Sequence, residues 1–203
     1  ESTNLSNTKI NNEYVFSGEN SKIKPFNEKE NYIGSNTKKK VNVDENSYKE
    51  IGLNGFEVFY YTKDKTSKDN ILIFNEQERI FDQDEKEWIL NKDTNKLEST
   101  TWNGVLKTLE VFKNSENKYE VKVPNENGKT LESKRNLFDT LNNSINSLKG
   151  LDEDGNKVSN DPIEDYNFRV EGIRKNIDEF QEIFDNINLQ HSNLGYKNRM
   201  IEE

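Results

Sequence analysis

The feature that most restricts the fold is a heptad repeat in the C-terminal part of the chain. From Tyr166 onward, seam positions recur at alternating spacings of four and three. This spacing keeps one stripe of a helix facing a partner helix. At ~1.5 Å per residue the helix would be on the order of 60 Å long, so it needs a partner along most of its length. The stripe consists of Tyr166, Val170, Ile173, Ile177, Phe180, Phe184, Ile187, His191, Leu194, Asn198 and Ile201.

Local signals mark where the helices begin and end. Asp161 is suited to cap the long helix, with Pro162 at its first position and Glu164 placed to reach back to the cap N–H. A shorter helical pattern, ended by Gly150, precedes it. We predict helices over 1–13, 131–149 and 162–200. The apolar positions of the shorter pattern are Leu137, Leu141, Ile145 and Leu148.

Two phenylalanines of the heptad repeat lie midway along the predicted long helix. Phe180 and Phe184 both occupy positions of the stripe that should face a partner. We therefore expect both side chains to be buried at the centre of the helical domain.

The region between these helices has the pattern of β-structure. Short apolar or aromatic runs, such as 56–61 and 71–74, are separated by polar turns. Runs 79–81 and 88–90 flank a polar stretch and predict a hairpin. Strands at this spacing are typical of a small all-β domain. The predicted fold class is α+β: an elongated antiparallel helical domain, built from 1–13 and 131–203, with an inserted β-rich domain over 14–130.

Composition excludes several functional classes. Charged residues make up 33% of the 203 residues and hydrophobic ones 30%, which favours slender shapes over one large core. Disorder is the competing interpretation, but 11 Phe and 8 Tyr in patterned positions oppose it. A net charge of −9 disfavours nucleic acid binding. The chain has no Cys and one His, and no apolar run approaches the ~18 residues of a membrane span. We predict no enzyme activity, no metal site and no cofactor.

Several suggestive motifs have simpler explanations. The acidic run from Asp152 fails the spacing of a calcium loop, so we interpret it as a solvated turn. Trp88 and Trp102 could form a carbohydrate platform but are more typical of a β-domain core. His191 fits a half-exposed seam position better than a pH sensor. Asn198 either sets the register of the helix pairing or marks where the packed seam ends.

Five short motifs occur along the chain in the order found in one protein family. Tyr14, Phe16 and Gly18, followed by Pro25-Phe26, match a turn that ends the family's first long helix. On these motifs the chain resembles the bacterial flagellar hook–filament junction proteins, which are hook-associated proteins of the flagellin family. It departs from many members at 60–130, which looks like an enlarged β domain. The remaining motifs are 32–34, 55–59, 137–141 and 194–202.

The resemblance implies a structural role. Such a protein joins the hook to the flagellin filament as an axial adaptor. It is exported through the flagellar type III pathway, to the exterior or, with periplasmic flagella, to the periplasm. The helical domain would resemble the D1 domain of flagellin, and residues 1–203 would lack both terminal helical regions. Implied partners are further copies in a ring, the adjacent hook-associated protein and flagellin, with no nucleic acid and no membrane.

Three residues near the C-terminal end are candidates for a subunit interface: His191, Asn198 and Arg199. We expect residues 1–203 alone to be mainly monomeric, because intramolecular contacts should cover most of the apolar stripe. Two alternatives stay open. One is an extracellular binding or adhesin module whose β domain grips a glycan or a host protein. The other is flagellin itself.

Overall fold

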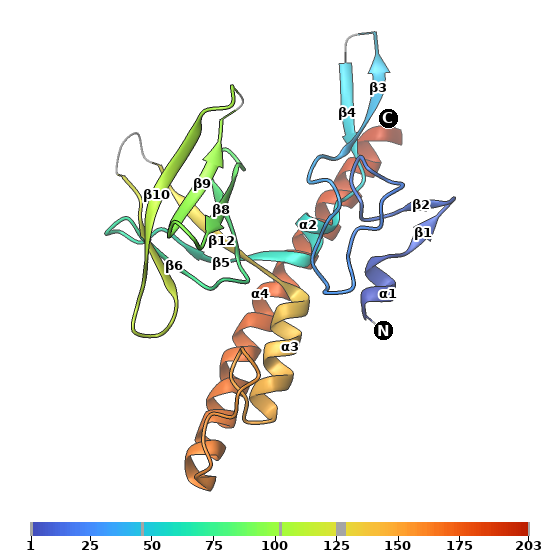
Figure 1. Cartoon of the computed structure of the whole chain (residues 1–203). Helices are drawn as coiled ribbons and strands as arrows, with labels where there is room; N and C mark the ends of the chain where they lie inside the picture. The colour runs from blue at the N-terminus through green and yellow to red at the C-terminus, as the bar shows by residue number, and fades with distance from the viewer. Residues whose placement is uncertain (1, 46, 102, 125–128, 203) are drawn as a thin grey trace. The chain divides into compact units, whose positions relative to one another are not determined.

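The chain folds into two units, each with its own core. A computed structural model describes residues 2–45, 47–101, 103–124 and 129–202, and their side chains except those of 2, 3, 43 and 196–202. The first unit combines Glu1–Tyr61 with Asn136–Glu203, and the second is Thr62–Arg135 (Figure 1). Residues 14–61 therefore group with the helices, whereas the sequence assigned them to the β-rich domain. The division into independently folding domains stays a prediction.

The second unit is built on an eight-stranded sheet with the order β5-β12-β7-β8-β9-β10-β11-β6. The defined pairings are antiparallel. The predicted 79–81 and 88–90 hairpin is confirmed, with Ile80 opposite Trp88. The strands are β5 (Tyr60–Lys65), β6 (Ile71–Phe74), β7 (Arg79–Asp82), β8 (Glu87–Asn91), β9 (Lys96–Thr100), β10 (Leu106–Lys113), β11 (Tyr119–Lys122) and β12 (Leu131–Asn136).

One face of this sheet carries the core of the second unit. Trp88 packs partly buried against that core, and its indole N–H donates to Asp82 Oδ2 at 3.1 Å. This agrees with the core interpretation of Trp88; Trp102 lies outside the described residues. The buried residues of the core are Leu72, Phe74, Ile80, Leu97, Val111, Tyr119, Val121, Val123 and Leu131.

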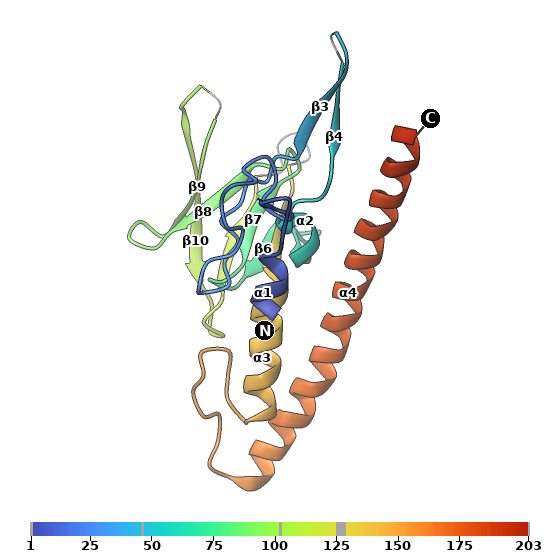
Figure 2. The ribbon, with the colours of Figure 1, turned by 90° about the vertical axis from the view of Figure 1, so that its right-hand side faces the viewer.

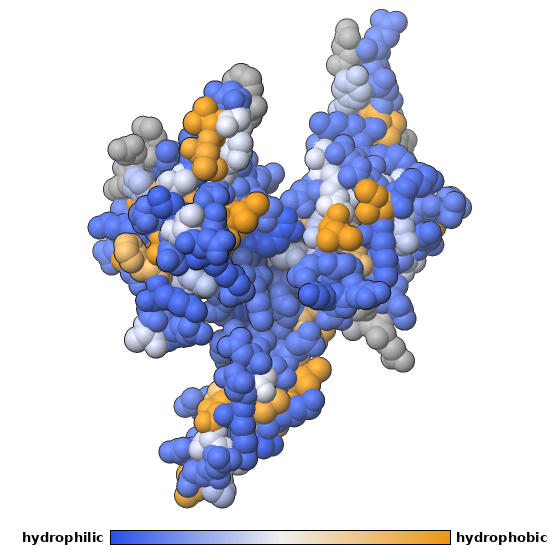
Figure 3. Space-filling model, viewed as in Figure 1, coloured by the Kyte–Doolittle hydropathy of each residue, from blue (hydrophilic) through white to orange (hydrophobic). Residues whose placement is uncertain are grey.

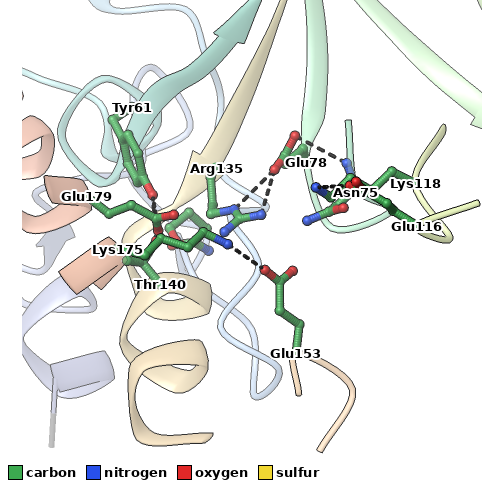
Figure 4. A network of polar contacts seen from close by, with 11 residues as sticks. Tyr61, Asn75, Glu78, Glu116, Lys118, Arg135, Thr140, Glu153, Lys175 and Glu179 are labelled. Atoms are coloured by element: carbon green, nitrogen blue, oxygen red, sulfur yellow. Dashed lines mark hydrogen bonds and ion pairs between the residues drawn. The ribbon is translucent and has the colours of Figure 1, made fainter. Parts of the chain in front are cut away.

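A buried ion pair joins β12 to the turn before β7. The Arg135 guanidinium donates to Glu78 Oε1 at 2.7 and 3.1 Å, and both side chains are almost fully buried (Figure 4). Glu78 Oε2 also accepts from the Asn75 N–H at 3.3 Å. Removing one partner of such a pair would leave an uncompensated buried charge, so the pair fixes how this turn meets β12.

The first unit contains the helices and two small hairpins. The long α4 and the shorter α3 run side by side along part of α4 (Figure 2). In the hairpins β1 pairs with β2 and β3 with β4. The elements are α1 (Ser2–Ser6), β1 (Lys9–Ile10), β2 (Glu13–Tyr14), β3 (Lys39–Asp44), β4 (Ser47–Ile51), α2 (Gly55–Phe59), α3 (Leu137–Leu148) and α4 (Pro162–Glu202).

An aromatic cluster forms the core of the first unit. Phe26 is fully buried, and its ring centroid lies 5.1 Å from that of Phe59 and 5.3 Å from that of Phe138. Tyr32 packs against Phe26, and its hydroxyl donates to the Ser35 or Phe16 carbonyl. Edge-to-face rings at these separations stabilise beyond their buried area. The members are Phe16, Phe26, Tyr32, Phe56, Phe59, Tyr60 and Phe138.

Three predicted elements were wrong in type over part or all of their length. Residues 131–136 form β12 rather than the start of a helix, because their alternating inward face includes the polar Ser133 and Arg135. Residues 55–59 form a short helix instead of a strand, because Asn54 and Glu57 make a reciprocal capping box. Within 1–13 the helix ends at Ser6, and β1 and β2 follow. The α+β class and the helix over 162–200 are confirmed.

Candidate functional site: the two faces of the C-terminal helix

The start of α4 is fixed by the predicted cap. Asp161 Oδ1 accepts the N–H groups of Ile163 and Glu164 at 2.9 and 3.0 Å. Glu164 does not bond the cap N–H directly. Its Oε2 instead accepts from the Ser159 hydroxyl, whose oxygen accepts the Asp161 N–H at 3.0 Å. The return half of the capping box therefore runs through Ser159.

The face of α4 that packs against the rest of its unit is largely polar. Asn176 and Glu179 are buried there, together with Ile183. Gly172 allows the closest approach, because a Cβ at that position would lie 2.7 Å from Ser147 Cβ on α3. We call this face the polar seam. Its residues are Asp165, Arg169, Gly172, Asn176, Glu179, Ile183 and Asn186.

A hydroxyl pair holds the carboxylate of Glu179 inside the unit. The Tyr61 hydroxyl lies 3.2 Å from Glu179 Oε2 and 2.7 Å from Thr140 Oγ1 (Figure 4). All three side chains are buried. The contact links β5, α3 and α4, so Glu179 fixes the rotation of α4 about its axis.

Two further residues of the polar seam satisfy backbone carbonyls at helix ends. The Asn186 amide donates to the carbonyls of Glu57 and Tyr60, at 3.0 and 3.1 Å, where α2 ends. The Arg169 guanidinium donates to the Leu148 carbonyl at the end of α3, at 3.0 Å. Carbonyls in the last helical turn have no partner within their own helix, so both contacts attach α4 by capping its neighbours.

The apolar stripe of the heptad repeat flanks this packed face, and its described members are half-buried or exposed. Ile177 is 63% exposed and Phe184 62%, while Ile183 beside Phe184 is 5% exposed. The expected burial of Phe184 was therefore wrong, and Phe180 is half-buried. From Asp165 to Asn186 the packed face lies one residue N-terminal to the stripe, because hydrogen bonds and the close approach at Gly172 select the polar seam.

The shorter helix, α3, also exposes apolar side chains and buries polar ones. Ile145 and Leu148 of its apolar pattern are about half exposed, whereas Thr140, Asn143 and Ser144 are buried. In Figure 3, hydrophobic residues recur along the helical part of the surface, between hydrophilic ones. Exposed apolar side chains in a row mark a surface that another chain or segment covers.

The sequence-predicted interface residues follow the polar seam in the chain. His191 is exposed. The side chains of Asn198 and Arg199 lie outside the described residues, so the three stay candidates. The polar seam was missed because its members do not stand out by hydrophobicity. The seven-residue spacing of Gly172, Glu179 and Asn186 is the signal that could have indicated it.

A second surface feature is a hollow of about 290 Å³ beside the two small hairpins. Its lining is mostly apolar, with Glu13 and Lys39 as the charged members. A hydrogen bond from Lys39, supported by the Ser21 hydroxyl, lowers the pKa of Glu13. On the second unit, a hydrogen bond to Glu76 raises the pKa of Lys92. Both ion pairs are exposed and add little to stability. The hollow is lined by Ile10, Asn11, Glu13, Tyr14, Val15, Gly18, Ser21, Lys39, Ile51, Gly52 and Leu53.

Among the described residues, no helix is both long and apolar enough to cross a membrane. Among the same residues, no group of three or more His, Cys, Asp or Glu side chains is arranged to hold a metal ion.

The fold has counterparts among solved structures. FlgL from Xanthomonas campestris matches with a TM-score of 0.53 and 15% identity, covering 98% of this chain and 72% of that one. The flagellar junction protein FlgL from Legionella pneumophila matches with a TM-score of 0.50 and 15% identity, covering 98% and 75%. No protein-family model and no curated protein sequence matches the chain. The chain therefore shares the fold of FlgL along almost its whole length.

Neighbouring residues on opposite faces of α4 test which face is packed. Ile183→Ala should lower the free energy of unfolding by about 2–4 kcal/mol, because it leaves a cavity. Phe184→Ala should change it by less than about 1 kcal/mol, because that ring is mainly in solvent. Urea unfolding followed by circular dichroism measures both. A larger loss for Phe184→Ala would mean that the apolar stripe is the packed face after all.

Two glycines of α4 should respond oppositely to the same change. Gly172→Ala puts a methyl group against Ser147 and should destabilise by about 1–3 kcal/mol through overpacking. At Gly195 a Cβ would meet nothing within 4 Å. Gly195→Ala should therefore stabilise by about 0.5–1 kcal/mol through helix propensity. Melting curves of the two variants give the signs. Equal effects would contradict the close approach of α3 and α4.

Proposed function

We propose that the chain is a structural component of the bacterial flagellum that joins the hook to the flagellin filament. The observation that carries this proposal is the likeness of fold to FlgL over 98% of the chain. The five sequence motifs support it independently. Four of them contribute aromatic residues to one core: Phe16 and Phe26 from the first, then Tyr32, Phe59 and Phe138. A common core built from the motifs is what a shared architecture requires.

The helical part of this proposal is a D1-like domain of the flagellin type. The exposed apolar stripe on α4 supports it, because Ile177 and Phe184 follow a heptad spacing that suits a further helix. We propose that this helix comes from chain outside residues 1–203. Partners would be further copies in a ring, the adjacent hook-associated protein and flagellin. The location would be the flagellum, after export by the type III pathway.

The assembly role rests on surface residues and is separable from folding. His191, Asn198 and Arg199 are proposed to contact a neighbouring subunit or the terminal helices. The alternative of a glycan-binding or host-binding adhesin gains no support from the comparisons. No catalytic role is proposed. No role in the junction is proposed for the 60–130 insertion, because the sequence resemblance does not extend to it.

Deletion in the native bacterium tests the function directly. Electron microscopy should show hooks without attached filaments, and plasmid-borne full-length protein should restore swimming. Phe184→Asp should fail to restore it, because a charge on the stripe blocks helix packing. Gln181→Asp, at an exposed site of the same helix, should restore it. The Asn198→Ala/Arg199→Ala double variant should impair swimming. Deleted cells with normal filaments would refute the proposal.

The oligomeric state of residues 1–203 is the second test. We propose that this chain alone is mainly monomeric in dilute solution, because its pairing helices would lie outside it. The exposed stripe acts against that state, since uncovered Ile and Phe side chains favour pairing. Light scattering at micromolar concentration should give the mass of one chain. A stable dimer abolished by Phe184→Asp would show that the stripe pairs with its own copy.

A further inference from the structure

Two Asn-Gly pairs lie within the residues that the structure describes, one buried and one exposed. Asn-Gly is the sequence in which a backbone nitrogen can most easily reach the preceding side-chain carbonyl, because glycine has no Cβ to hinder the approach. One pair, Asn54-Gly55, is buried in the first unit. The other, Asn103-Gly104, is exposed in the turn that joins β9 to β10 (Figure 1). A third pair, at 127–128, lies outside the described residues.

Asn54 is held on every side. It is 1% exposed, its Oδ1 accepts the Glu57 N–H at 2.8 Å, and its amide donates to the Asn36 carbonyl at 2.8 Å. The following N–H, of Gly55, is bonded to the Phe16 carbonyl at 2.7 Å. A Cβ at Gly55 would lie 2.7 Å from the Tyr32 ring, so solvent has no room there. Any rearrangement at this pair requires the core to open.

Asn103 lacks this confinement. Its side chain is exposed, and a Cβ at Gly104 would meet nothing within 4 Å. The Gly104 N–H is held by one backbone bond, to the Thr101 carbonyl at 2.9 Å. The Thr101 hydroxyl lies within hydrogen-bond distance of both Asn103 Oδ1 and the Val105 carbonyl, and when it donates to Asn103 it polarises the side-chain carbonyl toward attack. Turns at a hairpin end open at far lower free energy than a buried core.

We propose that Asn103 is a site of spontaneous covalent modification, deamidation through a succinimide, with Thr101 as a positioning residue. The Gly104 nitrogen loses its proton to solvent base and attacks Cγ of Asn103. A new N–Cγ bond closes the ring, and the side-chain nitrogen leaves as ammonia with the proton returned from solvent. Water then opens the ring at either carbonyl and leaves aspartate or isoaspartate. No electrons are transferred, and water is the one co-reactant.

The change alters the surface of the second unit. Each event adds one negative charge at the β9–β10 turn, on a chain whose net charge is already −9. The isoaspartate product also adds a methylene to the backbone between Thr101 and Gly104. Since register in a hairpin depends on the turn, this product should loosen the outer pairs of β9 and β10.

Peptide mapping of the intact 203-residue chain tests the proposal. After incubation at neutral pH and physiological temperature, deamidation and isoaspartate should accumulate at Asn103. The rate there should exceed that at Asn54 by on the order of 1,000-fold, because Asn54 reacts only after unfolding. In urea the two rates should converge, which shows that local sequence does not cause the difference. Equal native rates, or a difference that persists in urea, would overturn the proposal.

Variants separate the chemistry from the turn structure. Gly104→Ala should slow the reaction in both native and urea-unfolded chains, because its Cβ hinders attack. Thr101→Val should slow it only in the native chain, and Thr101→Ser should restore the native rate. A native Thr101→Val rate equal to or above that of the unchanged chain would remove Thr101 from the mechanism. Absence of any reaction at Asn103 in the native chain would refute the site.

Discussion

The first unit depends on the packing of aromatic rings around Phe26. Its first 61 residues form only short helices and hairpins joined by loops. Packing against the aromatic cluster holds these segments together. Phe26 meets Phe59 and Phe138, which come from α2 and α3. Because rings supply large apolar area at few rotatable bonds, a few of them can organise loops in a chain that is only 30% hydrophobic. The cluster joins α2 and α3 through Phe59 and Phe138, and α4 packs against these two helices.

Much of this arrangement could be predicted from local patterns. The cap at Asp161, the stop at Gly150 and the hairpin of β7 and β8 all follow from residue types at fixed offsets. Such signals involve few residues close in sequence, so distant packing rarely overrides them. The strand β12, predicted as helix, depends instead on a residue that is distant in sequence. Its inward face holds Arg135, whose partner Glu78 is distant in sequence, and no hydrophobic alternation marks a strand that buries an ion pair.

Which face of α4 packs against the rest of its unit could not be predicted from hydrophobicity alone. The heptad repeat is present, but its stripe is half-buried at Val170, Phe180 and Ile187 and exposed at Ile177 and Phe184. The packed surface is set one residue away, by Gly172 against Ser147, Glu179 beside Tyr61, and Asn186 at the end of α2. These choices depend on tertiary partners more than 20 residues away in sequence. Because α4 carries a seven-residue repeat both in its apolar stripe and in its polar seam, hydrophobicity does not decide which of the two faces the core.

The polar seam also has a thermal consequence. Exposing apolar surface raises the heat capacity of a protein, and exposing polar surface lowers it. Separating α4 from its unit would uncover Asn176, Glu179 and Asn186 together with Ile183, so the heat capacity change is smaller than for an apolar face of the same area. Separating the aromatic cluster would expose mainly apolar ring surface. The attachment of α4 should therefore vary less with temperature, while the cluster follows the curved stability of an ordinary hydrophobic core, and the two parts of one unit respond differently to cold.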